Sequence, residues 1–178
     1  MDSQKLALLR IGRQVCYALA VIGCYLMQTT PGFATFFGVK PIFLLPLAIC
    51  IAAREGVFPG ALWGAAAGLL WDIASGRTGG FFAIQLMAVC FGVAALVALY
   101  LRGSAVNLLL LCTGAALALV GNDLLFHYLL HGYTGVGALF LRSSLPTLIL
   151  TLIVCLPLRW LVNRIADRFD RALDAFGE

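Results

Sequence analysis

The sequence predicts an all-α membrane protein with six transmembrane helices in one compact bundle and both termini in the cytoplasm. Two observations of composition predict this class. Hydrophobic residues make up 62% of the 178-residue chain and charged residues only 11%, whereas a soluble domain carries about a quarter charged residues. Several apolar runs also approach the roughly 20 residues that a helix needs to cross a bilayer. The mean hydropathy of +1.01 agrees with a polytopic protein.

Six apolar runs form the predicted bundle, which occupies residues 1–160. They cover residues 12–27, 41–53, 57–75, 81–101, 105–130 and 137–158. The second run is short and contains Pro41 and Pro46. Only the first connection, residues 28–40, is longer than a few residues, so we expect neighbouring helices to form antiparallel hairpins.

The distribution of basic residues predicts the orientation. With the N-terminus inside, nine basic residues fall on the cytoplasmic side: Lys5, Arg10, Arg13, Arg54, Arg102, Arg159, Arg164, Arg168 and Arg171. Three fall outside: Lys40, Arg77 and Arg142. This excess of cytoplasmic Lys and Arg follows the positive-inside rule and places both termini in the cytoplasm. Because the net charge of +4 is explained in this way, it does not indicate nucleic-acid binding.

Residues 161–178 are predicted to continue the last span as an amphipathic cytoplasmic helix. Leu161, Ile165, Phe169, Leu173 and Phe176 recur at helical spacing, with Arg and Asp between them. One interpretation is a helix that lies on the lipid headgroups. The other is a docking helix for a cytoplasmic partner.

The third run carries a ladder of glycines in the stretch "FPGALWGAAAGLLWDIASG". Gly60, Gly64, Gly68 and Gly76 stand at multiples of four residues, and Asp72 occupies the remaining step. Positions four apart stay on one helical face, and glycine there lets another backbone approach closely. The ladder predicts a packing seam and makes the third span the expected centre of the bundle.

Asp72 is expected to face the protein interior because it shares the ladder face. An acid within a membrane is costly unless it is paired or hydrated. Arg77, Arg142 and Asn122 are its candidate partners. The alternative is that Asp72, about three residues from the outer end of the span, lies at the headgroups.

The fifth run contains a second polar cluster, "GNDLLFHYLLHGY". Asn122 and Asp123 begin it, and Asp123, His127 and His131 follow one another at four-residue intervals on one face. Three interpretations remain open. In order of preference they are a structural hydrogen-bonded pair of Asp123 and His127, a pocket for a small ligand or proton, and a metal site.

Catalytic chemistry has no positive support in the sequence. We find no nucleophile motif, phosphate-binding loop or dinucleotide fingerprint, and we therefore expect no catalytic residue, cofactor or bound metal. The six cysteines all fall inside apolar runs and form no CxxC pair. They are expected to behave as small buried hydrophobic residues.

Residues 40–80 resemble the rod shape-determining protein MreD family. The matching elements are "KPIFLLPLAICIAAREG" and "GALWGAAAGLLWDIASGRTGG", with a Gly-x-x-Trp-Asp step and a Gly-Gly pair before the next span. In the sixth run, "LRSSLPTLILTLIV" is similar to an Arg…Pro…Thr pattern of MreD-like proteins. The chain length and the six predicted spans agree with the family.

The resemblance implies a non-catalytic scaffold of the bacterial cell-wall elongation complex in the cytoplasmic (inner) membrane. Its implied partners are an MreC-type protein and, directly or indirectly, a RodA-type glycosyltransferase with its transpeptidase. The resemblance also implies a bundle similar in shape to the substrate-binding subunits of energy-coupling vitamin transporters. A transporter subunit is therefore the alternative function, with a pocket formed by Asp72, Asn122, Asp123 and His127.

Overall fold

The chain is all-helical throughout the part that the computed structural model describes, residues 2–30, 32, 40–76, 80–99, 105–123 and 145–174, which contain no strand. The helices are α1 (Asp2–Thr29), α2 (Leu44–Glu55), α3 (Val57–Ser75), α4 (Phe81–Leu99), α5 (Ala105–Asp123) and α7 (Leu145–Asp174). The predicted fold class is thus confirmed as far as its helical content. Among the described helices, four, α1, α3, α4 and α7, are long and apolar enough to cross a membrane.

The helix bounds agree best with prediction in the middle of the chain. α3 has the predicted bounds, and α4 begins at the predicted residue. α1 begins at Asp2 rather than near residue 12, because its charged first turns continue the helix beyond the apolar run. The described part of the predicted sixth run, from residue 145, and the first part of the tail form one helix, α7, of 30 residues.

The centre of the bundle is α2 and not α3, which corrects the expectation drawn from the glycine ladder. Every residue of α2 from Leu44 to Ala52 is buried, and α2 contacts each of the other described helices. In α3 only a single stripe is buried, formed by Gly60, Gly64, Ala67, Gly68 and Asp72. The ladder therefore marks a close contact on one face of α3. Burial on all sides requires apolar side chains around the whole helix, as in "LLPLAICIA" of α2.

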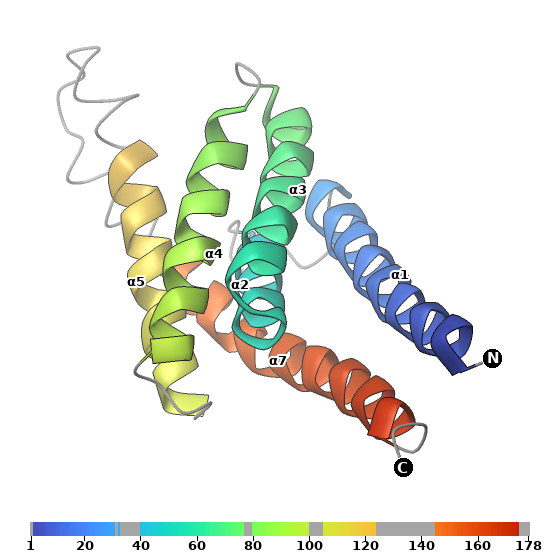
Figure 1. The fold of residues 1–178 in the computed structure, drawn as a ribbon. Helices are drawn as coiled ribbons and strands as arrows, with labels where there is room; N and C mark the ends of the chain where they lie inside the picture. The colour runs from blue at the N-terminus through green and yellow to red at the C-terminus, as the bar shows by residue number, and fades with distance from the viewer. Residues whose placement is uncertain are drawn as a thin grey trace, which may run out of the picture.

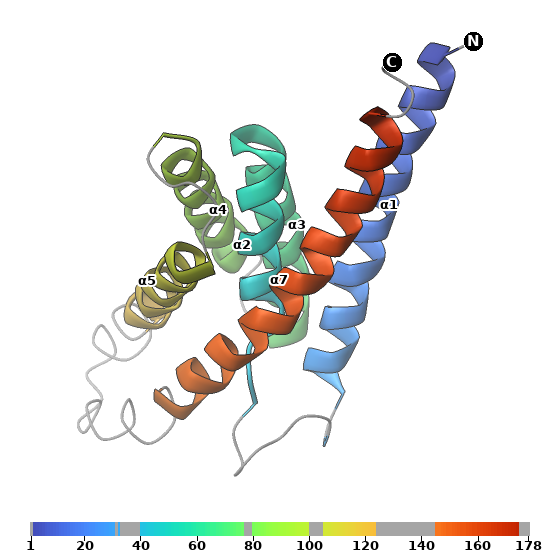
Figure 2. The ribbon, with the colours of Figure 1, turned by 90° about the horizontal axis from the view of Figure 1, so that it is seen from below.

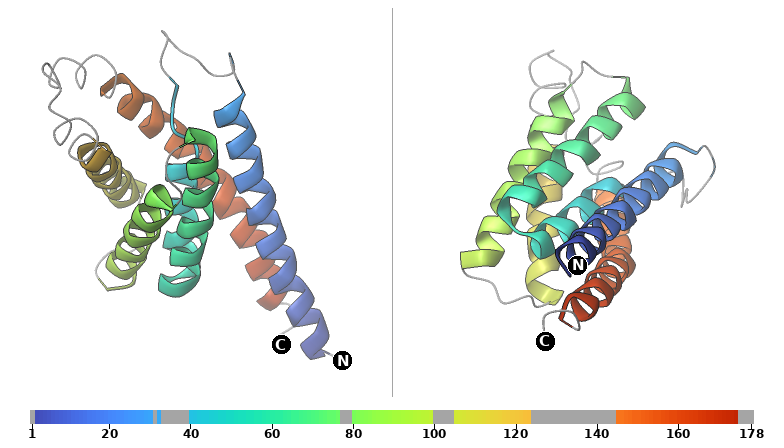
Figure 3. Two further views of the ribbon diagram at one scale, coloured as in Figure 1. Left: turned by 90° about the horizontal axis from the view of Figure 1, so that it is seen from above. Right: turned by 45° about the vertical axis from the view of Figure 1, so that its right-hand side comes forward.

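The α3–α4 hairpin and the α1–α7 pair are the two extended parts of the molecule. α3 and α4 run side by side, with α5 on the far side of α4 and α2 behind the hairpin (Figure 1). α1 leans away from α3 at one end, and α7 passes beneath the other helices to meet it (Figures 1 and 2). The start of α1 and the end of α7 lie together (Figure 3).

The final turns of α7 pack against the beginning of α1. Phe169 covers Gly12, where a Cβ atom would lie 3.1 Å from the Phe169 ring. Asp170 accepts a hydrogen bond from Arg13 at 3.1 Å. Val162 and Ala166 are buried on the same face of α7. The described part of the tail, residues 161–174, is therefore half of an antiparallel helix pair.

Many large apolar side chains on the outside of the described helices are exposed. In α1 the buried stripe is Tyr17, Val21 and Cys24. Large apolar side chains occupy the opposite side of the helix and are exposed: Leu8, Ile11, Val15, Leu19, Ile22 and Leu26. Exposed apolar area on this scale indicates contact with a membrane or with another protein.

Candidate functional site

Gly60, Gly64 and Gly68 lie where α3 touches its neighbours most closely. A Cβ atom at Gly60 would stand 2.7 Å from the Cα of Ala52 in α2. At Gly64 it would stand 2.7 Å from the carbonyl oxygen of Leu86, and at Gly68 it would stand 2.5 Å from the Cα of Ala83, both in α4. These distances are shorter than real Cβ contacts, and the opposing atoms belong to the backbone. The helices therefore lie so close together at these three positions that only glycine, which has no Cβ atom, fits without a shift.

Gly76 does not belong to the packing seam in which the four-residue spacing placed it. A Cβ atom there would meet nothing within 4 Å, and the residue has a φ of 63°. It is the C-cap of α3, in the left-handed conformation that glycine adopts without strain. Gly76 ends the helix, and the packing seam consists of the other three glycines.

Asp72 caps the N-terminus of α4. Its side chain is buried, with 4% of the residue exposed. Oδ1 accepts the backbone N–H of Phe82, and Oδ2 accepts those of Gly80 and Ala83, each at 3.1 Å. The first N–H groups of a helix have no partner within it, and the helix dipole favours a negative charge beside them. The carboxylate satisfies three of these donors from a neighbouring helix.

The position of Asp72 agrees with the inward face predicted for it, but its described partners are backbone groups of α4. Arg77 and Arg142, two of the expected partners, lie outside the described residues. A carboxylate with three N–H donors is already stabilised as a charged group, because hydrogen bonds to an anion are among the strongest in proteins. Its chemical role in this arrangement is to join α3 to α4.

The second predicted cluster falls mainly outside the described residues. Asn122 is half-buried near the end of α5, and Asp123 is the last residue of that helix. His127, His131 and Arg142 lie in the part of the chain that is not described. The pairing of Asp123 with His127 stays a prediction.

Gln28 of α1 caps the N-terminus of α2 in a second contact between helices. Its Oε1 accepts the backbone N–H groups of Phe43 and Leu44 at 3.1 and 3.2 Å. Beside it, the Thr151 hydroxyl of α7 accepts the N–H of Ile42 at 3.1 Å and donates to the carbonyl of Thr147 at 2.7 Å. The segment that leads into α2 thus has its donors satisfied by side chains of α1 and α7.

A charged network joins α1, α2 and α7 at the end where both termini lie. Arg13 bonds Glu55 and Asp170, each at 3.1 Å, and the Glu55 side chain is only 4% exposed. Gln14 donates to Glu55 at 3.1 Å and accepts from the indole of Trp63 at 2.8 Å. This chain of contacts connects α3, α1, α2 and α7 through one buried carboxylate.

A second pair of contacts lies closer to the surface at the same end. Arg54 donates to Asn163 at 2.9 Å and forms an ion pair with Asp167. Both members of that ion pair are substantially exposed, at 37% and 48%. Exposed pairs contribute little stability, so the Glu55 network is the stronger connection between these helices.

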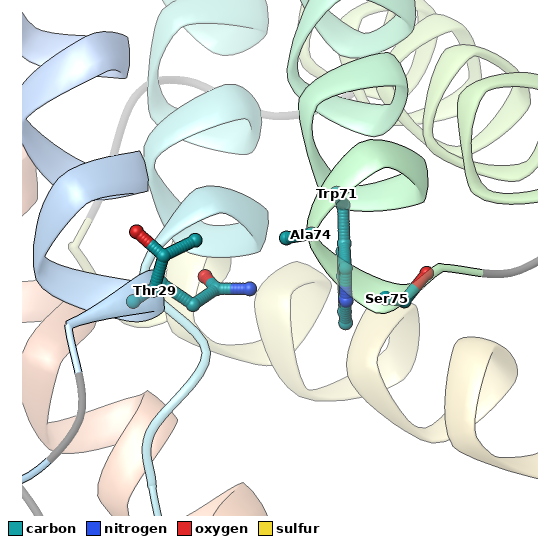
Figure 4. A pocket seen from close by; sticks show the side chains of 5 residues that line it. Thr29, Trp71, Ala74 and Ser75 are labelled. Carbon is teal, nitrogen blue, oxygen red and sulfur yellow. The ribbon is translucent and has the colours of Figure 1, made fainter.

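Two pockets open between α1 and α3, one at each end of their contact. One, of about 240 Å³, is lined by Gln28, Thr29, Trp71, Ala74 and Ser75. Thr29 stands on the α1 side, and Trp71, Ala74 and Ser75 stand on the α3 side (Figure 4). The other, of about 440 Å³, lies at the end with the termini and is lined by Arg10, Ile11, Gln14, Val15, Ala18 and Trp63.

The cysteines of the central helices are packed together without forming a metal centre within the described ranges. Cys50 of α2, Cys112 of α5 and Cys155 of α7 are all buried in the apolar core. No three His, Cys, Asp or Glu side chains among the described residues form a group suited to hold a metal ion. All six cysteines are free thiols, and five are buried.

Sequence reasoning missed the residues that connect the helices at their ends. Gln14, Gln28 and Glu55 do not stand out in the sequence, because each lies at the edge of an apolar run, where a polar residue is ordinary. The signal that could have found Glu55 is its position: an acid in the very short turn "REG" between two apolar runs, with basic residues on neighbouring helices. Gln14, Gln28, Glu55 and Asp72 each bond a helix other than their own.

Comparison with known proteins adds no relative. No protein-family profile, no curated protein and no solved structure matches the chain.

Proposed function

We propose that the chain crosses the bacterial cytoplasmic membrane six times, with both termini in the cytoplasm. Four helices have the required length and apolar character. α5 contains a shorter apolar segment, Val106–Leu119, within its 19 described residues. α2 has 12 residues, about 18 Å of helix, whereas the hydrocarbon layer is about 30 Å thick.

The short α2 fits a membrane crossing because its lead-in is enclosed by protein. Pro41 and Phe43 are buried, and the N–H of Ile42 is bonded to Thr151. Non-helical backbone is tolerated at membrane depth where it is buried in this way. The lead-in can therefore complete the crossing that α2 is too short to make alone.

The orientation is supported by the basic residues at the paired ends of α1 and α7. Arg10 and Arg13 lie on α1, and Arg164, Arg168 and Arg171 lie on α7. The test introduces single cysteines at Gln4 and Arg171 and applies a membrane-impermeant maleimide to spheroplasts, with the unmodified protein as control. We expect both sites to be protected until the membrane is opened. Labelling of either site from outside would overturn the topology.

We further propose that the protein is a non-catalytic scaffold of the cell-wall elongation complex that binds an MreC-type partner. The proposal starts from the resemblance of residues 40–80 to the MreD family. That segment contains α2, which is buried from Leu44 to Ala52, together with α3 and the lead-in to α4. Its two distinctive features, the glycine ladder and the Asp72 carboxylate, both join helices to one another.

The single observation that favours the scaffold over the transporter subunit is the bonding of Asp72. A ligand pocket needs polar groups that are available to a ligand. Both oxygens of Asp72, which the transporter alternative places in the pocket, are occupied by backbone N–H groups of α4 and its lead-in. Asp72 in this state holds the fold and has no carboxylate oxygen left without a donor.

The experiment that separates the two functions is affinity purification of the tagged chain from its native membranes. We expect an MreC-type protein and a RodA-type glycosyltransferase to co-purify, and depletion of the chain to turn rod-shaped cells round. An unrelated polytopic protein with the same tag serves as the control. Co-purification of an ATPase pair, with normal cell shape after depletion, would instead identify a transporter subunit.

A further inference from the structure

The 440 Å³ groove between α1 and α3 has the features of a lipid site. It lies between residues 10–18 of α1 and Trp63 of α3. α1 leans away from α3 toward the end of the molecule that holds both termini (Figures 1 and 3). Ile11, Val15 and Ala18 form its α1 wall, and Trp63 forms its α3 wall. The wall from Ile11 to Ala18 extends over about 10 Å of helix.

The polar atoms of the groove wall are turned away from the groove. The Trp63 indole N–H donates to Gln14 at 2.8 Å, and the Gln14 amide in turn donates to Glu55 at 3.1 Å. Glu55 is held by Arg13. These bonds fix the position of Trp63 and leave its ring and the hydrocarbon part of Gln14 as the available surface. A groove with such walls is suited to an acyl chain.

Arg10 is the charged residue that lines the groove. Only the apolar atoms of its side chain contribute to the lining, the residue is exposed, and it forms no ion pair with any carboxylate of the described residues. Arg13, one turn further along α1, is by contrast bonded to two acids. A guanidinium with no described carboxylate partner, at the end of an apolar groove, is complementary to an amphiphile with an anionic head.

We propose that this groove binds one acyl chain of an anionic glycerophospholipid, with the phosphate on Arg10. The volume favours a lipid chain over a partner helix. A helix segment about 10 Å long and about 10 Å across would occupy roughly 800 Å³, well above the volume of the groove. This site goes beyond the scaffold function and does not depend on which partner the protein has.

Trp63 allows the site to be tested by fluorescence. The double variant Trp71→Phe/Trp160→Phe keeps Trp63 as the only tryptophan. The protein is reconstituted into vesicles containing either phosphatidylglycerol or phosphatidylcholine with brominated acyl chains, since bromine quenches tryptophan fluorescence on contact. We expect phosphatidylglycerol to compete about fivefold better for the site, the effect of one basic residue at an anionic headgroup.

Two substitutions assign the preference to the groove. Arg10→Gln should remove the selectivity for phosphatidylglycerol, whereas Arg168→Gln, a change of an exposed arginine on α7, should leave it intact. Ala18→Leu should fill the groove and reduce quenching by both lipids. The parallel protein Trp63→Phe/Trp160→Phe keeps only Trp71, at the other end of α3, and should show no preference.

The proposal is overturned if Trp63 is quenched equally by the two lipids, which would mean that bulk acyl chains pass the groove without selection of the headgroup. It is also overturned if Arg10→Gln keeps the preference, or if the Trp71 protein shows the same preference as the Trp63 protein. The last two results would place the anionic lipid elsewhere on the molecule.

Discussion

At the scale of single residues, two side chains between helices act as caps for a helix other than their own. Asp72 of α3 holds the first N–H groups of α4, and Gln28 of α1 holds those that lead into α2. In lipid, water is not available to satisfy such donors, so each must find a partner within the protein. The two caps therefore fix where α4 and α2 begin.

The Asp72 cap predicts that Asp72→Asn is not a conservative change. Both carboxylate oxygens accept N–H groups, whereas asparagine offers one oxygen and turns an NH₂ group toward the remaining donor. We expect the variant to lose about 1–3 kcal/mol of unfolding free energy, measured by thermal unfolding in detergent. Ser75→Ala is the control, because among the described residues the Ser75 hydroxyl is bonded only to the Asp72 carbonyl. Equal stability of the two variants would contradict the cap.

The Gln28 cap can be tested in the same way, with a substitution that keeps the length of the side chain. Gln28→Met removes the acceptor and leaves the N–H groups of Phe43 and Leu44 without it, so we expect a loss of about 1–3 kcal/mol. Gln28→Glu keeps the acceptor oxygens and should retain more stability than the Met variant. Thr29→Ala is the neighbouring control, because the bonds of its hydroxyl within the described part of the chain go to carbonyls of its own helix. The same detergent unfolding measurement separates these outcomes.

At the scale of elements, the close contact between α3 and α4 depends on the absence of a side chain at Gly64 and Gly68. Gly92 of α4 provides a matched contrast within the same hairpin, since a Cβ atom there would meet nothing within 4 Å. All three residues lie inside helices, so alanine improves helix propensity equally at each. Any difference among them reports the close approach of the two helices.

We expect Gly68→Ala to destabilise the bundle and Gly92→Ala to be neutral or slightly stabilising. At Gly68 the new atom would stand 2.5 Å from backbone atoms of Ala83 and Phe82, so the helices must separate. Overpacking of this kind costs about 1–3 kcal/mol, whereas the helix propensity gained is at most about 1 kcal/mol. Unfolding midpoints of the two variants measure the difference. Equal midpoints would show that α3 and α4 separate without cost.

The elements could be predicted from the sequence more fully than their contacts. Apolar runs give α3 its bounds, and the four-residue period of Gly60, Gly64 and Gly68 gives its close-packed face. The partners of Asp72 could not be predicted, because they are backbone N–H groups that no residue type marks. The central place of α2 was missed because the sequence shows only that its run is short, whereas burial depends on what surrounds the helix.

At the scale of the whole molecule, α1 and α7, which lie near opposite ends of the sequence, pack against each other, and both contact α2. Their contact consists of Phe169 over Gly12 and of the network built on Glu55. The acids Asp167 and Asp170 of α7 face Arg54 and Arg13, while Arg164, Arg168 and Arg171 are exposed. The pair therefore presents a basic outer surface at the end proposed to be cytoplasmic, where anionic headgroups attract Arg side chains.

The Glu55 network predicts that removing its cation, Arg13, lowers the free energy of unfolding strongly, and lowers it more than removing both charges does. Arg13→Met leaves the Glu55 carboxylate buried with only Gln14 as a described donor. Breaking a buried pair in this way costs about 3–5 kcal/mol. The double variant Arg13→Met/Glu55→Gln removes both charges and should recover much of that loss, because no buried charge remains unpaired.

Arg54→Met is the matched control, since the Arg54–Asp167 pair also joins α2 to α7, with both partners exposed. Exposed pairs contribute about 0–1 kcal/mol, so this variant should unfold near the midpoint of the parent protein. High salt should weaken the Arg54 pair and leave the Glu55 network nearly unchanged, because screening acts mainly on exposed charges. If Arg13→Met costs no more than Arg54→Met in the same detergent, the buried carboxylate does not depend on Arg13, and the α1–α7 pair is held by the packing around Phe169 alone.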